Sequence, residues 1–144
     1  MEEMKPRRIL VLCTGNSARS QMAEGLLKAK LGERFDVDSA GTKPSIARPE
    51  AIEALREIGI DISGNRSKSV DEFAGIEIDY VLTVCDNAKE NCPYFPAKTR
   101  LIHHAFHDPA EAEGTFDERV SEFRKVRDEI AEYIDAEFLD QLKA

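Results

Sequence analysis

Short apolar runs alternate with amphipathic stretches along this chain. Four runs have the continuous apolar character of buried strands, and they are Arg7–Leu12, Phe35–Ser39, Ile78–Val84 and Leu101–Ile102. Three segments have helical periodicity, and they span roughly Ala18–Leu31, Pro49–Ile58 and Phe116–Leu139. The pattern therefore predicts strands alternating with helices, which is typical of a parallel sheet covered on both sides.

The helix predictions depend on where apolar residues recur. In the last helix they fall on one face, at Val120, Phe123, Val126, Ile130, Tyr133 and Ile134. The predicted helix begins at Pro49 and is stopped by Gly59, and its apolar face consists of Ala51, Ile52, Leu55 and Ile58. No repeat or linker divides the 144 residues, so we predict a single α/β domain over residues 1–144.

Composition narrows the function classes. The formal net charge of −8 argues against nucleic-acid binding, which relies on clustered Lys and Arg. No apolar run is long enough to cross a membrane, and Ile9–Leu12 is too short for the core of a signal peptide. We therefore expect a cytoplasmic protein with neither nucleic-acid nor membrane partners.

The three cysteines, Cys13, Cys85 and Cys92, are an odd number, which does not suggest a framework of structural disulfides. Each could be a buried hydrophobe, a metal ligand or a reactive thiol. Cys13 and Cys85 both come just after a predicted strand, and parallel sheets bind ligands at the carboxyl ends of their strands. Core packing alone would not place two cysteines at that edge.

The segment between the first strand and the first helix carries the clearest chemical signal. It consists of Cys13, Thr14, Gly15, Asn16, Ser17, Ala18, Arg19 and Ser20. A loop in this position points N–H groups inward, and the helix dipole adds positive potential. Gly15 and Asn16 tolerate unusual backbone angles. Arg19 can bind two oxygens at once, and the same potential favours a Cys13 thiolate. We predict an oxyanion site with a cysteine nucleophile, for either phosphate or arsenate.

Two further groups follow later in the chain. Pro109 holds Asp108 extended. Placed over the loop, Asp108 could donate a proton to a leaving oxygen, although Asp-Pro is also an ordinary turn.

Cys85 and Cys92 are interpreted as a redox couple, because a zinc pair would usually be closer together and need two more ligands. The three histidines do not form a metal set with the cysteines, so we predict no metal and no cofactor.

Together these segments resemble the thioredoxin-coupled arsenate reductases, which share the fold of the low-molecular-weight protein tyrosine phosphatases. The resemblance covers nearly the whole chain, through residues 13–24, 39–42, 59–63, 84–93 and 108–109. It implies a three-layer sandwich, with a four-stranded parallel sheet and helices on both faces. It also implies a role in arsenic detoxification.

The family mechanism assigns roles to five residues. Cys13 would attack the arsenic of arsenate, with Arg19 and the loop amides holding the oxygens, and Asp108 would protonate the leaving hydroxide. Cys85 would then attack Cys13, releasing arsenite and leaving a Cys13–Cys85 disulfide. Cys92 would attack Cys85, and thioredoxin or a similar dithiol protein would reduce the resulting Cys85–Cys92 disulfide. We expect the enzyme to be a monomer.

The chain departs from the family pattern beside the loop. Some relatives bind potassium there, through residues that match Asn16, Glu24 and Ser39 and through an acid near position 68. This chain has Lys68, whose charge could replace that of the ion, so we expect no potassium requirement. Ala18 stands where some relatives have a cysteine, which should matter little.

Two alternatives stay open. A protein tyrosine phosphatase would use the same nucleophile, arginine and acid, but it has no use for two further cysteines. Those phosphatases also carry aromatic residues just after the Asp-Pro pair, where this chain has Ala110 and Glu111. Weak hydrolysis of small aryl phosphates is still expected from a shared anion site. A non-enzymatic oxyanion or redox sensor is the second alternative, and the complete catalytic set disfavours it.

Overall fold

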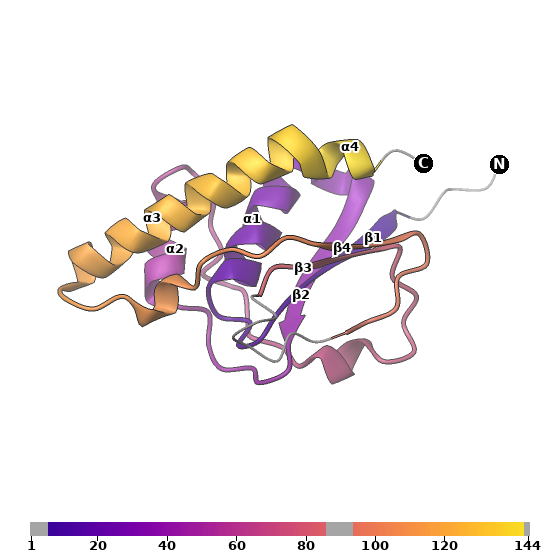
Figure 1. Ribbon diagram of the computed structural model, residues 1–144, viewed down its shortest axis with the longest axis horizontal. Helices are drawn as coiled ribbons and strands as arrows, with labels where there is room; N and C mark the ends of the chain where they lie inside the picture. The colour runs from indigo at the N-terminus through magenta and orange to yellow at the C-terminus, as the bar shows by residue number, and fades with distance from the viewer. Residues whose placement is uncertain (1–5, 86–93, 143–144) are drawn as a thin grey trace.

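The computed structural model describes residues 6–85 and 94–142 (Figure 1). Its strands are β1 (Arg7–Cys13), β2 (Phe35–Gly41), β3 (Tyr80–Thr83) and β4 (Arg100–His103). Its α-helices are α1 (Arg19–Leu31), α2 (Pro49–Arg56), α3 (Phe116–Tyr133) and α4 (Leu139–Gln141). Three short 3₁₀ helices are η1 (Gly32–Arg34), η2 (Val70–Phe73) and η3 (Pro109–Glu111). All seven predicted elements are therefore present.

The four strands form one parallel sheet in the order β2-β1-β3-β4. The central strand β1 pairs with both neighbours, and its Leu12 lies opposite Ala40 of β2 and Thr83 of β3. Because β1 is covered on both faces, its residues from Ile9 to Cys13 are all buried, as expected of an interior parallel strand. This register brings the segments that follow β1 and β3 to the same edge of the sheet.

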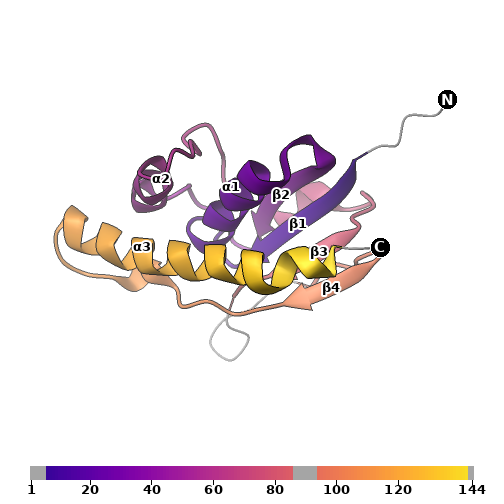
Figure 2. The same cartoon turned by 90° about the horizontal axis from the view of Figure 1, so that it is seen from above.

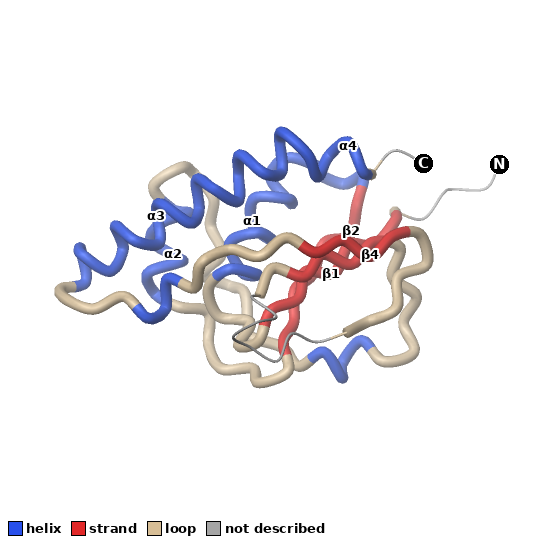
Figure 3. Tube along the Cα trace, viewed as in Figure 1, coloured by secondary structure: helices blue, strands red, loops and turns tan. Residues whose placement is uncertain are grey.

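Two apolar layers cover the sheet, one on each face. Figure 3 shows the helices α1, α2 and α3 on one side of the sheet and a short helical segment on the other. The larger layer packs α1, α2 and α3 against one face, and Figure 2 shows these helices side by side there. All six apolar positions predicted for the last helix are buried, and all but Val120 belong to this layer. The smaller layer packs Phe73 of η2 and Phe95 against Leu10 and Leu12 on the other face. The predicted three-layer α/β architecture is confirmed.

Two details differ from the sequence predictions. The last helix is interrupted after Tyr133 by a π-helical turn, η4 (Ile134–Phe138), and the pattern of apolar residues did not predict this turn. Ile58, which was assigned to the apolar face of the second helix, is 47% exposed because α2 ends at Arg56. Within the described residues, no helix is both long and apolar enough to span a membrane.

Candidate active site

The segment from Cys13 to Ser20, which we call the anion loop, connects the end of β1 to the start of α1, as predicted. Residues outside the loop bind four of its carbonyl oxygens. Lys43 N–H donates to Thr14, Arg48 N–H donates to Ser17, and Ser67 Oγ donates to Gly15 at 3.1 Å. The fourth carbonyl, that of Asn16, accepts from the side chain of Gln21 at 3.1 Å. Since the carbonyls are turned outward, the loop N–H groups are left to face the interior of the loop, which is the arrangement that binds an oxyanion.

The backbone of the loop depends on Asn16. Its φ of 46° makes it the only non-glycine residue with a positive φ among the described residues. Asparagine tolerates this left-handed conformation better than most residues. Gly15 was expected to share this task, but it is not among the glycines with positive φ. The prediction was therefore right for Asn16 and wrong for Gly15.

A glycine at the end of β2 lets the loop approach the sheet. A Cβ added to Gly41 would lie 2.7 Å from the carbonyl oxygen of Cys13 and closer still to that of Thr14. Both are backbone atoms and could not move without displacing the loop. Sequence reasoning did not single out Gly41 for this role, although a glycine directly after a predicted strand is a signal of close approach.

Cys13 is a free, buried thiol at the base of the loop. Its Sγ lies 2.8 Å from the hydroxyl oxygen of Ser20. That oxygen also accepts a hydrogen bond from the side-chain amide of Asn16 at 2.8 Å. Either atom of the Cys13–Ser20 contact can be the donor. A hydroxyl that donates to sulfur stabilises the thiolate, which is the nucleophilic form.

Arg19 connects the loop to the predicted acid. Its side chain is buried, although the residue is charged, and it donates to the carbonyl oxygen of Phe106 at 3.3 Å. The guanidinium also lies 3.6 Å from a carboxylate oxygen of Asp108. The fold thus brings the predicted arginine and the predicted acid together at the loop.

Asp108 has the extended backbone expected before proline, with φ −82° and ψ 107°. One carboxylate oxygen accepts from the N–H of Ala110 at 3.0 Å and caps η3. The other faces Arg19, and the side chain keeps 32% of its surface exposed. The Asp-Pro pair is therefore an ordinary cap and, in addition, a carboxyl group placed at the loop. The two interpretations of this pair are compatible.

Cys85 lies at the same edge of the sheet as Cys13. It follows β3, just as the loop follows β1, and the N–H of Val84 donates to the carbonyl oxygen of Leu12 at 2.9 Å. Cys85 is fully buried and belongs to the same apolar cluster as Cys13. Cys92 and the whole segment between Cys85 and Cys92 lie outside the described residues.

The histidines occupy the positions expected of surface and packing residues. His103 and His107 are exposed. His104 stacks on Tyr133, with ring centroids 4.0 Å apart, and on Phe106 at 4.7 Å. Within the part of the chain that the structure describes, no group of three or more His, Cys, Asp or Glu side chains is arranged to hold a metal ion.

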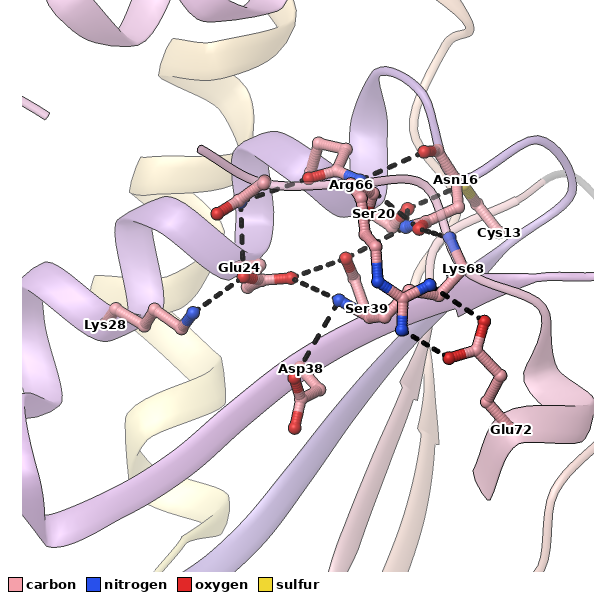
Figure 4. A network of polar contacts seen from close by, with 12 residues as sticks. Cys13, Asn16, Ser20, Glu24, Lys28, Asp38, Ser39, Arg66, Lys68 and Glu72 are labelled. Carbon is pink, nitrogen blue, oxygen red and sulfur yellow. Dashed lines mark hydrogen bonds and ion pairs between the residues drawn. The ribbon is translucent and has the colours of Figure 1, made fainter. Parts of the chain in front are cut away.

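A polar network extends from the loop under the start of α1 (Figure 4). The Asn16 amide donates to Ser39 of β2, and Ser39 in turn donates to Glu24 of α1 at 2.6 Å. Glu24 is 1% exposed, so a carboxylate is buried close to the loop. At the edge of this network, burial raises the pKa of Asp38, and the neighbouring Lys68 acts in the opposite direction. The family resemblance had placed Asn16, Glu24, Ser39 and position 68 together beside the loop, and the structure adds the hydrogen bonds that connect them.

Comparison with known proteins agrees with this geometry. The family described as "Low molecular weight phosphotyrosine protein phosphatase" matches residues 8–144. The chain belongs to this family. It is 47% identical over 131 residues to an arsenate reductase of Halalkalibacterium halodurans, covering 91% of this chain and 94% of that protein.

Solved structures of family members have the same architecture. An arsenate reductase in the oxidized state superimposes with a TM-score of 0.77 at 28% identity, covering 96% of this chain and 99% of that one. The thioredoxin-dependent arsenate reductase of Corynebacterium glutamicum superimposes with a TM-score of 0.60 at 28% identity, covering 90% of this chain and 62% of that one. The predicted family resemblance and fold are thus confirmed.

Proposed function

We propose that this protein reduces arsenate to arsenite and is regenerated by thioredoxin or a similar dithiol protein. The observation that carries the proposal is a second buried cysteine, Cys85, at the same sheet edge and in the same apolar cluster as Cys13. The relatives named arsenate reductase and the thioredoxin-dependent structural neighbour support the same conclusion. Arsenate has the tetrahedral shape and negative charge that the loop amides and Arg19 are suited to bind.

The first step joins sulfur to arsenic. The Cys13 thiolate attacks the arsenic atom while Arg19 and the amides of Thr14 to Ser20 bind the oxygens. One hydroxide leaves, and Asp108 protonates it to water. The 3.6 Å separation of Asp108 from Arg19 supports this role for Asp108. Arsenic is still pentavalent at this stage.

The second step transfers two electrons. Cys85 attacks the sulfur of Cys13, the sulfur–arsenic electron pair stays on arsenic, and trivalent arsenite leaves. The Cys13–Cys85 disulfide that remains holds the oxidising equivalents. Attack of Cys92 on Cys85 then gives a Cys85–Cys92 disulfide and regenerates Cys13. Reduction of that disulfide by a dithiol protein completes the cycle.

The alternative is hydrolysis of a phosphate monoester by Cys13, Arg19 and Asp108. The family name and the shared anion loop support such chemistry as a weak side activity. As a main activity it leaves Cys85 unexplained. The protein also has no aromatic side chain in the η3 segment after Asp108, where Ala110 and Glu111 stand. Arsenate reduction gives Cys85 a role and requires no aromatic side chain at that position.

A coupled assay tests the proposal. NADPH oxidation is followed with arsenate, thioredoxin and thioredoxin reductase, and repeated with glutathione and glutaredoxin. The wild-type protein should oxidise one dithiol per arsenate, whereas Cys13→Ser should be inactive but folded. Arg19→Lys should also lose most activity, because an ammonium group cannot reproduce the guanidinium fork. Release of phosphate from aryl phosphates without arsenate-dependent oxidation would refute the proposal in favour of the phosphatase.

The order of the thiols can be tested separately. Cys92→Ser should complete one turnover, release arsenite and stop at the Cys13–Cys85 disulfide, whereas Cys85→Ser should stall before that disulfide forms. Peptide mapping after arsenate treatment distinguishes the two products. A wild-type protein that accumulated mainly a Cys13–Cys92 disulfide would overturn this order. We also predict that the segment between Cys85 and Cys92 changes shape during the cycle, and this segment lies outside the described residues.

The monomeric state, the cytoplasmic location and the lack of a potassium requirement also stay predictions. Gel filtration of the reduced protein tests the first. Activity in potassium-containing and tetramethylammonium-containing buffers of equal ionic strength tests the last.

A further inference from the structure

Lys68 is an unusually buried lysine. It lies between the anion loop and β2, and its side chain is only 13% exposed. Its ammonium nitrogen is 3.8 Å from Glu24 Oε1 and 3.8 Å from Asp38 Oδ1 (Figure 4). Burial of a lysine is costly unless its charge is paired, so this position requires a carboxylate partner.

Glu24 is the more buried of the two partners. Its carboxylate accepts from Ser39 at 2.6 Å, from Asn65 at 3.2 Å and from Lys28 at 2.8 Å. A buried carboxylate without cationic partners would be strongly destabilised, because both oxygens have lost their water. Lys28 and Lys68 therefore hold the negative charge of Glu24 in place from two sides.

A directed chain of hydrogen bonds leads from Glu24 to the nucleophile. Ser39 donates to Glu24, so its oxygen is free to accept from the Asn16 amide at 2.8 Å. The same amide donates to Ser20 at 2.8 Å, and Ser20 contacts Cys13 at 2.8 Å. The carboxylate at one end thus orients each donor as far as Ser20, whose oxygen lies 2.8 Å from the sulfur.

Lys68 also contacts this series of hydrogen bonds through its backbone. Its backbone N–H donates to Asn16 Oδ1 at 2.8 Å, which fixes the amide with its nitrogen toward Ser20 and Ser39. The side chain and the main chain of one residue thus contact both ends of the Glu24–Asn16 connection.

We propose that Lys68 is a positioning residue for the Cys13 nucleophile, acting through the buried carboxylate of Glu24 and the Ser39–Asn16–Ser20 hydrogen bonds. The proposal rests on the assignment of Cys13 as the nucleophile. Lys68 does not touch the oxyanion. Its ammonium group holds the carboxylate of Glu24 in place, and Glu24 keeps the amide of Asn16 and the hydroxyl of Ser20 aligned toward the sulfur.

Lys68 is much more buried than Lys28, the other lysine that pairs with Glu24. The side chain of Lys28 is 51% exposed, so water can replace its ammonium group when it is removed. The site of Lys68 is largely closed to water, and removal of that charge leaves Glu24 and Asp38 facing each other without a cation between them. The two lysines pair with the same carboxylate, which makes them a matched comparison.

The test compares Lys68→Met, Lys68→Arg and Lys28→Met in the full-length reduced protein. Alkylation of Cys13 by iodoacetamide is followed over a range of pH by quantifying the peptide that contains Cys13. Loss of a buried charge interaction changes rates by about tenfold. We expect Lys68→Met to slow alkylation at neutral pH by about that factor, Lys68→Arg to retain most of the rate, and Lys28→Met to have the smaller effect. Equal rates in Lys68→Met and Lys28→Met would overturn the proposal.

A double-mutant comparison separates this role from general damage to the fold. In a Glu24→Gln background Lys68 still pairs with the 40% exposed Asp38, but the carboxylate that connects it to Ser39 and Asn16 is gone. Lys68→Met should therefore change the alkylation rate by less than about twofold in that background. The same tenfold loss in that background would overturn the proposal. Alkylation requires no arsenate, so this result is independent of whether the protein reduces arsenate. Single-turnover arsenite formation by the same variants then shows whether the loss reaches the chemical step.

Discussion

Replacement of Asn16 tests the anion loop most directly, because this residue supports both the backbone and the hydrogen bonds. Its side chain is in contact with Ser20 and Ser39 through the amide nitrogen and with Lys68 N–H through the amide oxygen. In Asn16→Ala the partly buried N–H of Lys68 loses its partner, which costs about 1–3 kcal/mol. Alanine at a φ of 46° adds about 1–2 kcal/mol. We therefore expect Asn16→Ala to lower the free energy of unfolding by about 2–5 kcal/mol.

Asn16→Gly separates these two contributions. Glycine relieves the backbone strain but adds about 0.4–1 kcal/mol of conformational entropy to the unfolded chain. It should therefore be more stable than Asn16→Ala by roughly 0.5–1 kcal/mol and less stable than the wild type. Urea denaturation measures both differences, and Cys13 alkylation reports on the loop. If Asn16→Ala matched the wild type within about 0.5 kcal/mol, or exceeded Asn16→Gly, this reasoning would be wrong.

Three further predictions follow from single contacts. Asp108→Asn should slow arsenite formation in a single turnover by about 10²–10⁴-fold, and a rate within a few-fold of wild type would eliminate Asp108 as the acid. Gly41→Ala should displace the loop and lower Cys13 alkylation, and oxyanion protection of Cys13 equal to wild type would contradict the close approach. The Arg124 side chain holds the pKa of Glu57 below its ordinary value, so this pair stabilises the fold above the ordinary pKa of a glutamate. That stabilisation is lost as the pH falls through the lowered value, and Glu57→Gln should flatten this part of the acid unfolding curve.

The sequence by itself determined the features that local pattern controls. The Cys13–Arg19 segment was predicted as an anion loop because a strand, a loop with Gly and Asn, and a helix follow one another directly. The last helix was predicted because its apolar residues recur at helical spacing, and all of them are buried. The extended conformation of Asp108 followed from the proline after it.

Only the tertiary structure decided which distant side chains meet. The contact of Arg19 with Asp108 depends on how the segment after β4 folds back over the loop, which no periodicity records. Gly41 resembled an ordinary residue in the sequence, and its role comes from the close approach of β2 to the loop. The family resemblance placed Lys68 beside the loop, but its pairing with Glu24 and Asp38 comes from the tertiary structure. The π-helical turn after Tyr133 was likewise missed, since one extra residue in a turn leaves the local apolar pattern almost unchanged. Packing between distant segments is specified by the whole core, so it could not be predicted from any single segment.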